Sequence, residues 1–199
     1  MIDFKRITQL HREMVVRWHE QEVDNPYDGF LGLVCEQFSY NFRLWHEEDI
    51  ARSPDVGDER IAAVKRAIDR FNQQRNDAIE RLDDWITSEL ESRCVTPAAD
   101  ARLNTETVGS VIDRLSILAL RIYHLEEQRD RPDASAEHRL NVTRKLAVAF
   151  AQHDDLSQAG QELIDDIVAG RKRHKTYRQM KMYNDPAMNP YLYRAQSAA

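Results

Sequence analysis

The chain has 199 residues, 42% of them hydrophobic, and a formal net charge of −6 at pH 7. This length suits one well-buried core, and no run approaches the roughly 20 apolar residues needed to cross a bilayer. Two cysteines without CxxC spacing argue against a metal or disulfide framework built on cysteine, so we expect one soluble, cytoplasmic domain without a membrane span.

The charge is distributed unevenly along the chain. Residues 171–199 carry seven Lys or Arg against one Asp, or +6, which leaves −12 for residues 1–170. We therefore divide the chain into a helical bundle, residues 1–170, and a basic C-terminal extension of the same domain, residues 171–199. The extension can dock on the acidic body, bind an anion or reach a partner. The acidic body argues against nucleic acid as a partner, because it would repel a polyanion.

Hydrophobic periodicity and turn residues predict five helices. The first two cover about residues 3–21 and 31–52, and a Pro- and Gly-containing turn separates them. A short reversal at residues 53–57 leads to the longest helix, about residues 58–93. A reversal this short makes the second and third helices antiparallel neighbours.

The fourth predicted helix, about residues 107–129, is apolar nearly all round and therefore belongs at the centre of the bundle. The fifth runs from Ser135 to about Gly170, and the extension can continue it before a break at residues 184–186. The expected fold is all-α: an antiparallel bundle of about five long helices with a basic C-terminal extension.

Arg75 lies in the middle of the apolar face of the third predicted helix. A guanidinium removed from water costs several kcal/mol unless acceptors receive its donors, so a partner must come from elsewhere in the fold. Counting outward from the turn places Arg75 opposite Glu36 and Gln37, and roughly 20 Å from Asp49. Asp113, a lone acid among aliphatic residues of the fourth helix, is the better candidate partner.

Further polar side chains lie on the helix faces that the hydrophobic pattern predicts to be buried. They form either a buried ionic network in a purely structural scaffold, or a polar pocket between the second, third and fourth helices. Because cations line such a pocket, its ligand would be an anionic small molecule. The predicted ligand-binding residues are Asn41, Trp45, Glu48, Asp49, Lys65, Asp69, Asn72, Arg75, Asn76, Asp113 and Arg114.

A metal site is the alternative. Glu80-x-x-Asp83 is similar to the ExxE and ExxD pairs with which helical NTP pyrophosphatases hold magnesium, although residues 47–49 do not complete the pattern. This interpretation predicts a Mg²⁺-dependent hydrolase of nucleotide or sugar phosphates that uses Asp69, Asp77, Glu80 and Asp83. The preferred interpretation needs no metal and no cofactor.

The histidines and nucleophiles carry no recognisable motif. No HExxH spacing occurs, and no Ser, Cys or Thr lies in a context such as GxSxG. His46 and His124 lie nearest the polar stripes, where a surface or hydrogen-bonded role explains each better than a catalytic base, and His153 fits a core position. Whether the protein is an enzyme stays open.

Three segments together resemble a known family. They are NFRLWHEED (41–49) with KRAIDRFNQQRND (65–77), GSVIDRLSIL (109–118) and KMYND (181–185), and they are similar to the uncharacterised bacterial family called domain of unknown function 4254. The resemblance covers about residues 30–190. It implies a helical cytoplasmic protein whose relatives are encoded near glycosyltransferases of surface polysaccharide synthesis, and it supplies no catalytic residue.

The resemblance makes a nucleotide sugar or sugar phosphate the expected anionic ligand. We therefore expect an accessory or binding protein for such a ligand, or for a partner glycosyltransferase, in bacterial surface polysaccharide synthesis. The hydrolase and the structural scaffold are the alternatives. A homodimer is a further expectation, because amphipathic bundles often cover a residual apolar strip by self-association.

Overall fold

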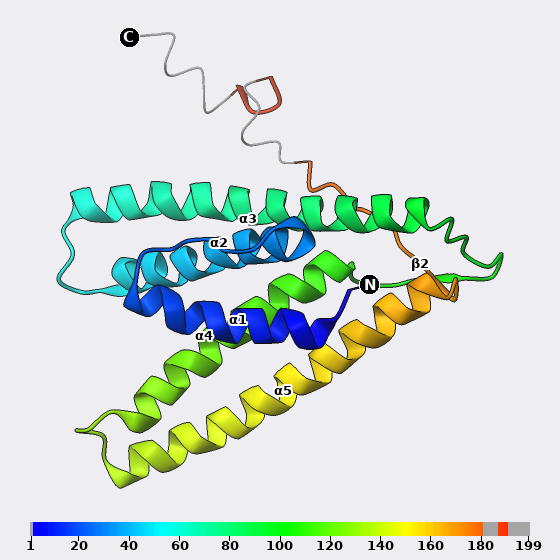
Figure 1. Ribbon diagram of the computed structural model, residues 1–199. Coiled ribbons are helices and arrows are strands. Elements are labelled where there is room, and N and C mark those ends of the chain that lie inside the picture. Colours follow the sequence, from blue (N-terminus) through cyan, green and yellow to red (C-terminus); the bar gives the residue numbers. More distant parts are fainter. Residues whose placement is uncertain (1, 181–186, 191–199) are drawn as a thin grey trace.

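The computed structural model describes residues 2–180 and 187–190, and long α-helices make up most of this part of the chain (Figure 1). In chain order the helices are α1 (Phe4–Glu20), α2 (Gly29–Arg52), α3 (Asp58–Ser92), α4 (Val108–Asp130) and α5 (Ala136–Val168). Two short strands, β1 (Arg102–Leu103) and β2 (Lys172–Arg173), pair in parallel. The predicted all-α bundle of five long helices is confirmed.

Polar side chains cap three of the helices. Asp3 accepts a backbone N–H at the start of α1 at 2.9 Å, and Thr107 and Ser135 do the same for α4 and α5 at 3.1 Å. The first turn of a helix has amide groups without partners inside the helix, and a capping oxygen satisfies one of them. Local sequence therefore sets where these helices begin.

The helices are arranged as two hairpins with α1 between them. α2 packs along α3, α4 packs along α5, and α1 contacts α2, α4 and α5 (Figure 1). The main core lies where these layers meet and includes the fully buried Phe38, Leu82, Ile112 and Leu115. Each such side chain stabilises the fold by about 1.5–3 kcal/mol. α4 contacts all four other helices, which confirms its predicted central position.

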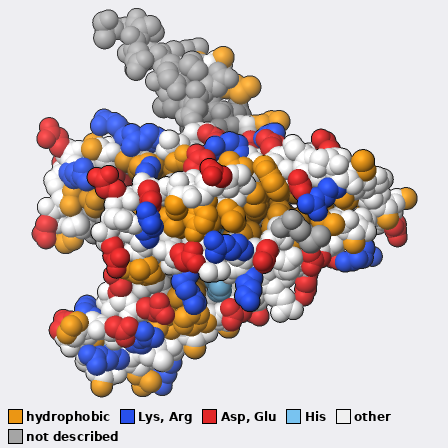
Figure 2. Space-filling model, in the orientation of Figure 1, with side chains coloured by type: hydrophobic (Ala, Val, Ile, Leu, Met, Phe, Trp, Pro, Cys, Tyr) orange, Lys and Arg blue, Asp and Glu red, His pale blue; other side chains and the backbone are white. Residues whose placement is uncertain are grey.

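The far end of the α4–α5 hairpin projects from the rest of the molecule, and in Figure 2 it forms a separate lobe. This end has a small core of its own, made of Ile122, Val142, Leu146 and Ala149. Acidic and basic side chains are interspersed over the face shown in Figure 2, and a hydrophobic area lies across its middle. Within the described residues, no helix combines the length and the apolar character needed to cross a membrane.

The predicted continuation of the fifth helix into the basic extension is wrong. Gly170 ends the helical region in the left-handed conformation, with φ of +74°, and a Cβ there would lie 2.9 Å from the carbonyl oxygen of Thr96. Glycine adopts this conformation without steric cost. The chain then turns away and pairs with β1, with Arg102 opposite Lys172. The predicted break at residues 184–186 lies outside the described residues.

Residues 174–179 of the basic extension lie against α3. Arg178 forms ion pairs with Glu80 at 3.1 Å and Asp84 at 2.7 Å, and the backbone N–H of Gln179 donates to Glu80 at 3.0 Å. His174 is also anchored, with its Nε2 3.0 Å from the carbonyl oxygen of Asp83. At Arg178 and Gln179 the extension is therefore docked on acidic side chains of the body.

Candidate functional site

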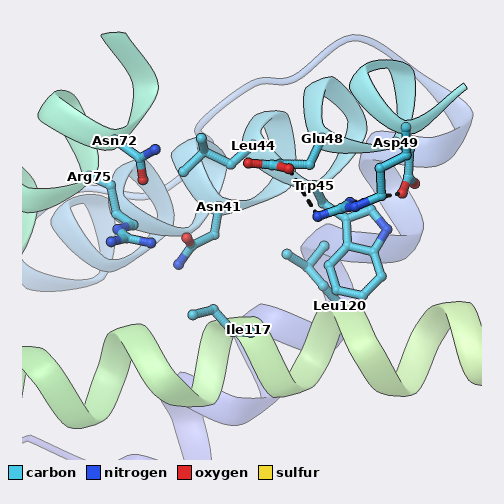
Figure 3. A pocket seen from close by; sticks show the side chains of 10 residues that line it. Asn41, Leu44, Trp45, Glu48, Asp49, Asn72, Arg75, Ile117 and Leu120 are labelled. Atoms are coloured by element: carbon cyan, nitrogen blue, oxygen red, sulfur yellow. Dashed lines mark hydrogen bonds and ion pairs between the residues drawn. The ribbon is translucent and has the colours of Figure 1, made fainter. Parts of the chain in front are cut away.

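A cavity of about 330 Å³ lies between α2, α3 and α4 (Figure 3). We call it the α2–α3–α4 cavity, and its lining residues are Asn41, Leu44, Trp45, Glu48, Asp49, Arg52, Asn72, Arg75, Ile117 and Leu120. The α2 residues recur every three or four positions, which places them on one face of the helix. Helices position all of these side chains, so the cavity has rigid walls.

Asp113 of α4 accepts two hydrogen bonds and forms an ion pair with side chains of α2 and α3. Its Oδ1 receives hydrogen bonds from Gln37 Nε2 at 2.7 Å and Asn41 Nδ2 at 2.8 Å. The same Asn41 nitrogen donates to Ser116 Oγ at 2.7 Å. Arg75 Nε lies 3.8 Å from Asp113 Oδ1 in an ion pair. The predicted pairing of Arg75 with Asp113 is confirmed, and the contacts join α2, α3 and α4.

Burial dominates the electrostatics of Asp113. Removal from water raises the pKa of its carboxyl group, and the charge of Arg75 and the hydrogen bond from Asn41 offset only part of this increase. Gln37 is completely buried, and its Oε1 has no hydrogen-bond partner among the described residues. A charged side chain in such surroundings interacts strongly with a charged ligand that enters the cavity, because little water screens the two charges.

The guanidinium of Arg75 is incompletely satisfied. Its Nε is buried without a hydrogen-bond partner among the described residues, because the 3.8 Å approach to Asp113 is too long for a hydrogen bond. One terminal nitrogen donates to Asn76 Oδ1 at 3.5 Å, which is also long. Figure 3 shows the guanidinium beside Asn41 and Asn72. Arg75 therefore retains donors that a ligand in the cavity could use.

The opposite end of the cavity holds one cation between two acids. Arg52 forms an ion pair with Glu48 at 2.9 Å and with Asp49 at 3.8 Å. All three side chains are well exposed, and exposed pairs of this kind contribute at most about 1 kcal/mol. Trp45 and Leu120 form the apolar wall at this end (Figure 3). Arg52 thus has two carboxylate partners, one of them within hydrogen-bond distance, whereas Arg75 has a single carboxylate partner at 3.8 Å.

Some predicted ligand-binding residues lie elsewhere. Lys65 and Asp69 pair with each other on the exposed face of α3, and Arg114 pairs with Glu106 at 2.7 Å. Arg114 follows Asp113 directly, so it points about 100° away around the helix. These three residues do not line the cavity. Of the predicted set, Asn41, Trp45, Glu48, Asp49, Asn72 and Arg75 line it, while Asp113 and Asn76 contact Arg75.

The four acids of the alternative metal site engage separate partners. These partners are Lys65 for Asp69, Gln73 for Asp77, Arg178 for Glu80, and the backbone N–H of Gly109 for Asp83. Burial also raises the pKa of Asp83, which is less exposed than the others. Within the described part of the chain, the side chains that come within reach of one metal ion are instead three histidines, His19, His46 and His124.

Sequence reasoning missed two members of the polar cluster, Gln37 and Ser116. Gln37 lies one turn before Asn41, and Ser116 lies one turn after Asp113, so both share a helix face with a predicted residue. Their spacing was a usable signal. A lone Ser or Gln at such a position is usually exposed, however. The contacts of Gln37 with Asp113 and of Ser116 with Asn41 become visible only when α2 and α4 are packed together.

Comparison with known proteins places the chain in a family without assigning it an activity. No curated protein and no solved structure matches it. A family model described as a protein of unknown function, DUF4254, matches residues 31–176, a range that includes the α2–α3–α4 cavity and Asp113. This match covers well over half of the chain, and the chain therefore belongs to the DUF4254 family.

Proposed function

We propose that the protein binds an anionic phosphorylated small molecule, of the nucleotide-sugar or sugar-phosphate class, in the α2–α3–α4 cavity. The observation that carries the proposal is Arg75, whose side chain lines the cavity, is 27% exposed and forms only a 3.8 Å ion pair with Asp113 and a 3.5 Å hydrogen bond with Asn76. Arginine presents several donors in a planar fork that matches a phosphate group. A phosphate at this end of the cavity would receive the donors that Asp113 does not.

The rest of the cavity suits the remainder of such a ligand. Asn72 lies beside Arg75 and can donate to a phosphate. The amide hydrogens of Asn41 are used by Asp113 and Ser116, so its oxygen can accept from a sugar hydroxyl, and Trp45 offers an aromatic wall. Ligand pockets commonly enclose about 300–1,000 Å³, so a volume of about 330 Å³ is at the lower end. We expect the phosphate and one ring to lie inside the cavity, with any larger part of the ligand outside it.

The biological setting of the proposal comes from the family resemblance. We propose an accessory role in bacterial surface polysaccharide synthesis, in the cytoplasm, with a glycosyltransferase as the partner enzyme and a homodimer as the assembled form. The acids of the Mg²⁺-dependent hydrolase alternative have separate partners, which gives that alternative less support than the cavity gives to ligand binding.

Thermal unfolding in the presence of candidate ligands tests the proposal. Inorganic phosphate, glucose 1-phosphate and UDP-glucose are added with EDTA or with Mg²⁺, and at least one sugar phosphate compound should raise the Tm in both conditions. Calorimetry should then show a loss of roughly 10–100-fold in affinity for Arg75→Met, the range expected when a charged hydrogen-bond donor is removed.

Arg114→Met is the matched control, because it removes a guanidinium on the same bundle but outside the cavity. It should bind the ligand as the unmodified protein does. Equal losses for the two variants would show that the cavity does not select the ligand. Strict dependence on Mg²⁺ would favour the hydrolase, and no response to any compound would leave the structural scaffold.

A further inference from the structure

Three histidines from distant parts of the chain meet at one point of the bundle. His19 lies in the last turn of α1, His46 in α2 and His124 in α4. One nitrogen of each ring can be chosen so that all three lie within 4.8 Å of one another, and each side chain is partly buried. The spacing in sequence forms no motif, because each histidine comes from a different helix.

Hydrogen bonds on the outside of the cluster fix the orientation of two rings. His19 Nδ1 lies 2.6 Å from the carbonyl oxygen of Val15, and His124 Nδ1 lies 2.7 Å from a carboxylate oxygen of Glu127. These oxygens can only accept, so each Nδ1 carries the hydrogen and donates it. In a neutral imidazole the other nitrogen, Nε2, then has a free lone pair.

Both of these Nε2 atoms lack a partner. The Nε2 atoms of His19 and His124 are buried and form no hydrogen bond with any described residue. A buried acceptor without a donor costs about 1–3 kcal/mol, so two of them in one cluster require an explanation. A bound cation would accept both lone pairs. Metal-binding histidines typically donate their second ring nitrogen to a carbonyl or carboxylate, as His19 and His124 do here.

Aromatic side chains hold the histidine rings in place. Tyr123 stacks on His19 with ring centroids 4.1 Å apart, and Trp45 stacks on His124 at 4.8 Å with the planes 9° from parallel. Phe42 packs edge-on against His19 at 5.0 Å and His46 at 4.6 Å. The rings are therefore preorganised in a largely apolar wall, which lowers the cost of ordering them around a ligand.

From this geometry we propose that His19, His46 and His124 bind a transition-metal ion, with Zn²⁺ as the ion that fits the ligand set. Imidazole nitrogen suits Zn²⁺, Cu²⁺ and Ni²⁺, whereas Mg²⁺ and Ca²⁺ require oxygen ligands. At Zn–N distances near 2.0–2.1 Å, tetrahedral ligands are about 3.4 Å apart. From separations of up to 4.8 Å, the nitrogens need to approach one another by at most about 1.4 Å, which small rotations of the rings provide.

Three protein ligands leave one position of a tetrahedral ion for water or another small ligand. The histidine cluster adjoins the α2–α3–α4 cavity through Trp45, whose ring lines the cavity and stacks on His124. The metal site does not depend on the proposed phosphorylated ligand. It also uses none of Asp69, Asp77, Glu80 and Asp83, so it is distinct from the magnesium site considered from the sequence.

Zn²⁺ titration of the full chain, stripped with EDTA and dialysed, tests the proposal. Calorimetry should give one Zn²⁺ per chain, and Co²⁺ in its place should give the visible absorption of a tetrahedral ion. His46→Phe should weaken Zn²⁺ binding at least 100-fold and abolish that absorption. The control is His138→Phe, which removes a histidine of α5 that is outside the cluster and should bind Zn²⁺ as the unmodified protein does.

A second variant decides the matter if His46→Phe does not fold, as judged by circular dichroism. Glu127→Gln changes an exposed side chain and weakens only the acceptor behind His124. Loss of such an outer partner typically costs 10–100-fold in metal affinity, and we expect a loss in that range. The proposal is overturned if no stoichiometric Zn²⁺ binds or if the deciding variant binds it unchanged. Arg75→Met should keep Zn²⁺, so failure of the phosphate site is distinguishable.

Discussion

The side chains around Asp113 differ in how much each depends on this carboxylate. Gln37 and Asn41 are buried and direct amide nitrogens at its Oδ1, whereas 27% of the Arg75 side chain is exposed and can reach water. Removal of the Asp113 carboxylate leaves buried amide donors without an acceptor. Removal of the partly exposed Arg75 guanidinium leaves no buried amide donor without an acceptor. Asp113 is therefore the member of the cluster whose loss affects the most partners.

We predict that Asp113→Ala lowers the free energy of unfolding by about 2–4 kcal/mol, because it removes the acceptor of two buried amides and the ion-pair partner of Arg75. Arg75→Met should cost less than about 1 kcal/mol, since methionine keeps the packing and Asp113 keeps its amide donors. Urea unfolding of both variants measures the difference. Equal and large losses would mean that Arg75 and Asp113 act as a strictly coupled pair.

Among the helices, a close approach of α3 and α4 depends on one glycine. A Cβ at Gly109 would lie 2.9 Å from the carbonyl oxygen of Ile79 and 2.9 Å from Asp83 Oδ1. Asp83 also accepts the backbone N–H of Gly109 at 2.8 Å, which places a carboxylate at the first turn of α4. A helix N-terminus favours negative charge there, so this contact sets both the approach and the register of the two helices.

We predict that Gly109→Ala lowers the free energy of unfolding by about 1–3 kcal/mol, because the neighbouring atom is helix backbone and cannot rotate away. Gly57→Ala is the control: it lies at the start of α3 with φ of −71°, and its added Cβ would have no neighbour within 4 Å. It should change stability by no more than about 0.5 kcal/mol. Similar values for the two variants in urea unfolding would contradict a close α3–α4 approach.

For the molecule as a whole, a neutral histidine in the core links stability to pH. His11 is completely buried beside Phe38, and burial lowers its pKa to about 3, with a smaller contribution from His153. Because the unfolded chain regains an ordinary histidine near 6.5, it binds a proton between these pH values that the folded chain does not. This contribution to stability is complete above pH 6.5 and is lost as the pH falls.

We predict that His11→Leu reduces the loss of stability on acidification. One proton bound on unfolding changes the free energy by about 1.4 kcal/mol per pH unit, so between pH 7.5 and pH 5 the unmodified protein should lose about 2 kcal/mol more than the variant. Urea midpoints at the two pH values measure this difference. His138→Leu, outside the main core, should keep the pH dependence, and a His11→Leu variant that also keeps it would contradict a neutral buried His11.

Much of the fold follows from local patterns. Hydrophobic periodicity and turn residues predicted helices within two or three residues of their observed bounds, because each helix must bury its own apolar stripe. The same reasoning predicted six of the ten residues that line the cavity, since spacing along α2 places Asn41, Trp45 and Glu48 on one face. Arg75 and Asp113 were paired because a buried cation requires an acid and the fourth helix offered one.

Contacts between distant segments could not be predicted in this way. The packing of three separate helices brings His19, His46 and His124 together, and the pairing of Arg102 with Lys172 joins residues on either side of the α4–α5 hairpin. Periodicity defines which face of each helix is buried, but not which helices meet or at what level along their axes. Those choices depend on the joint packing of all five helices, and they determine where the polar cavity and the histidine cluster form.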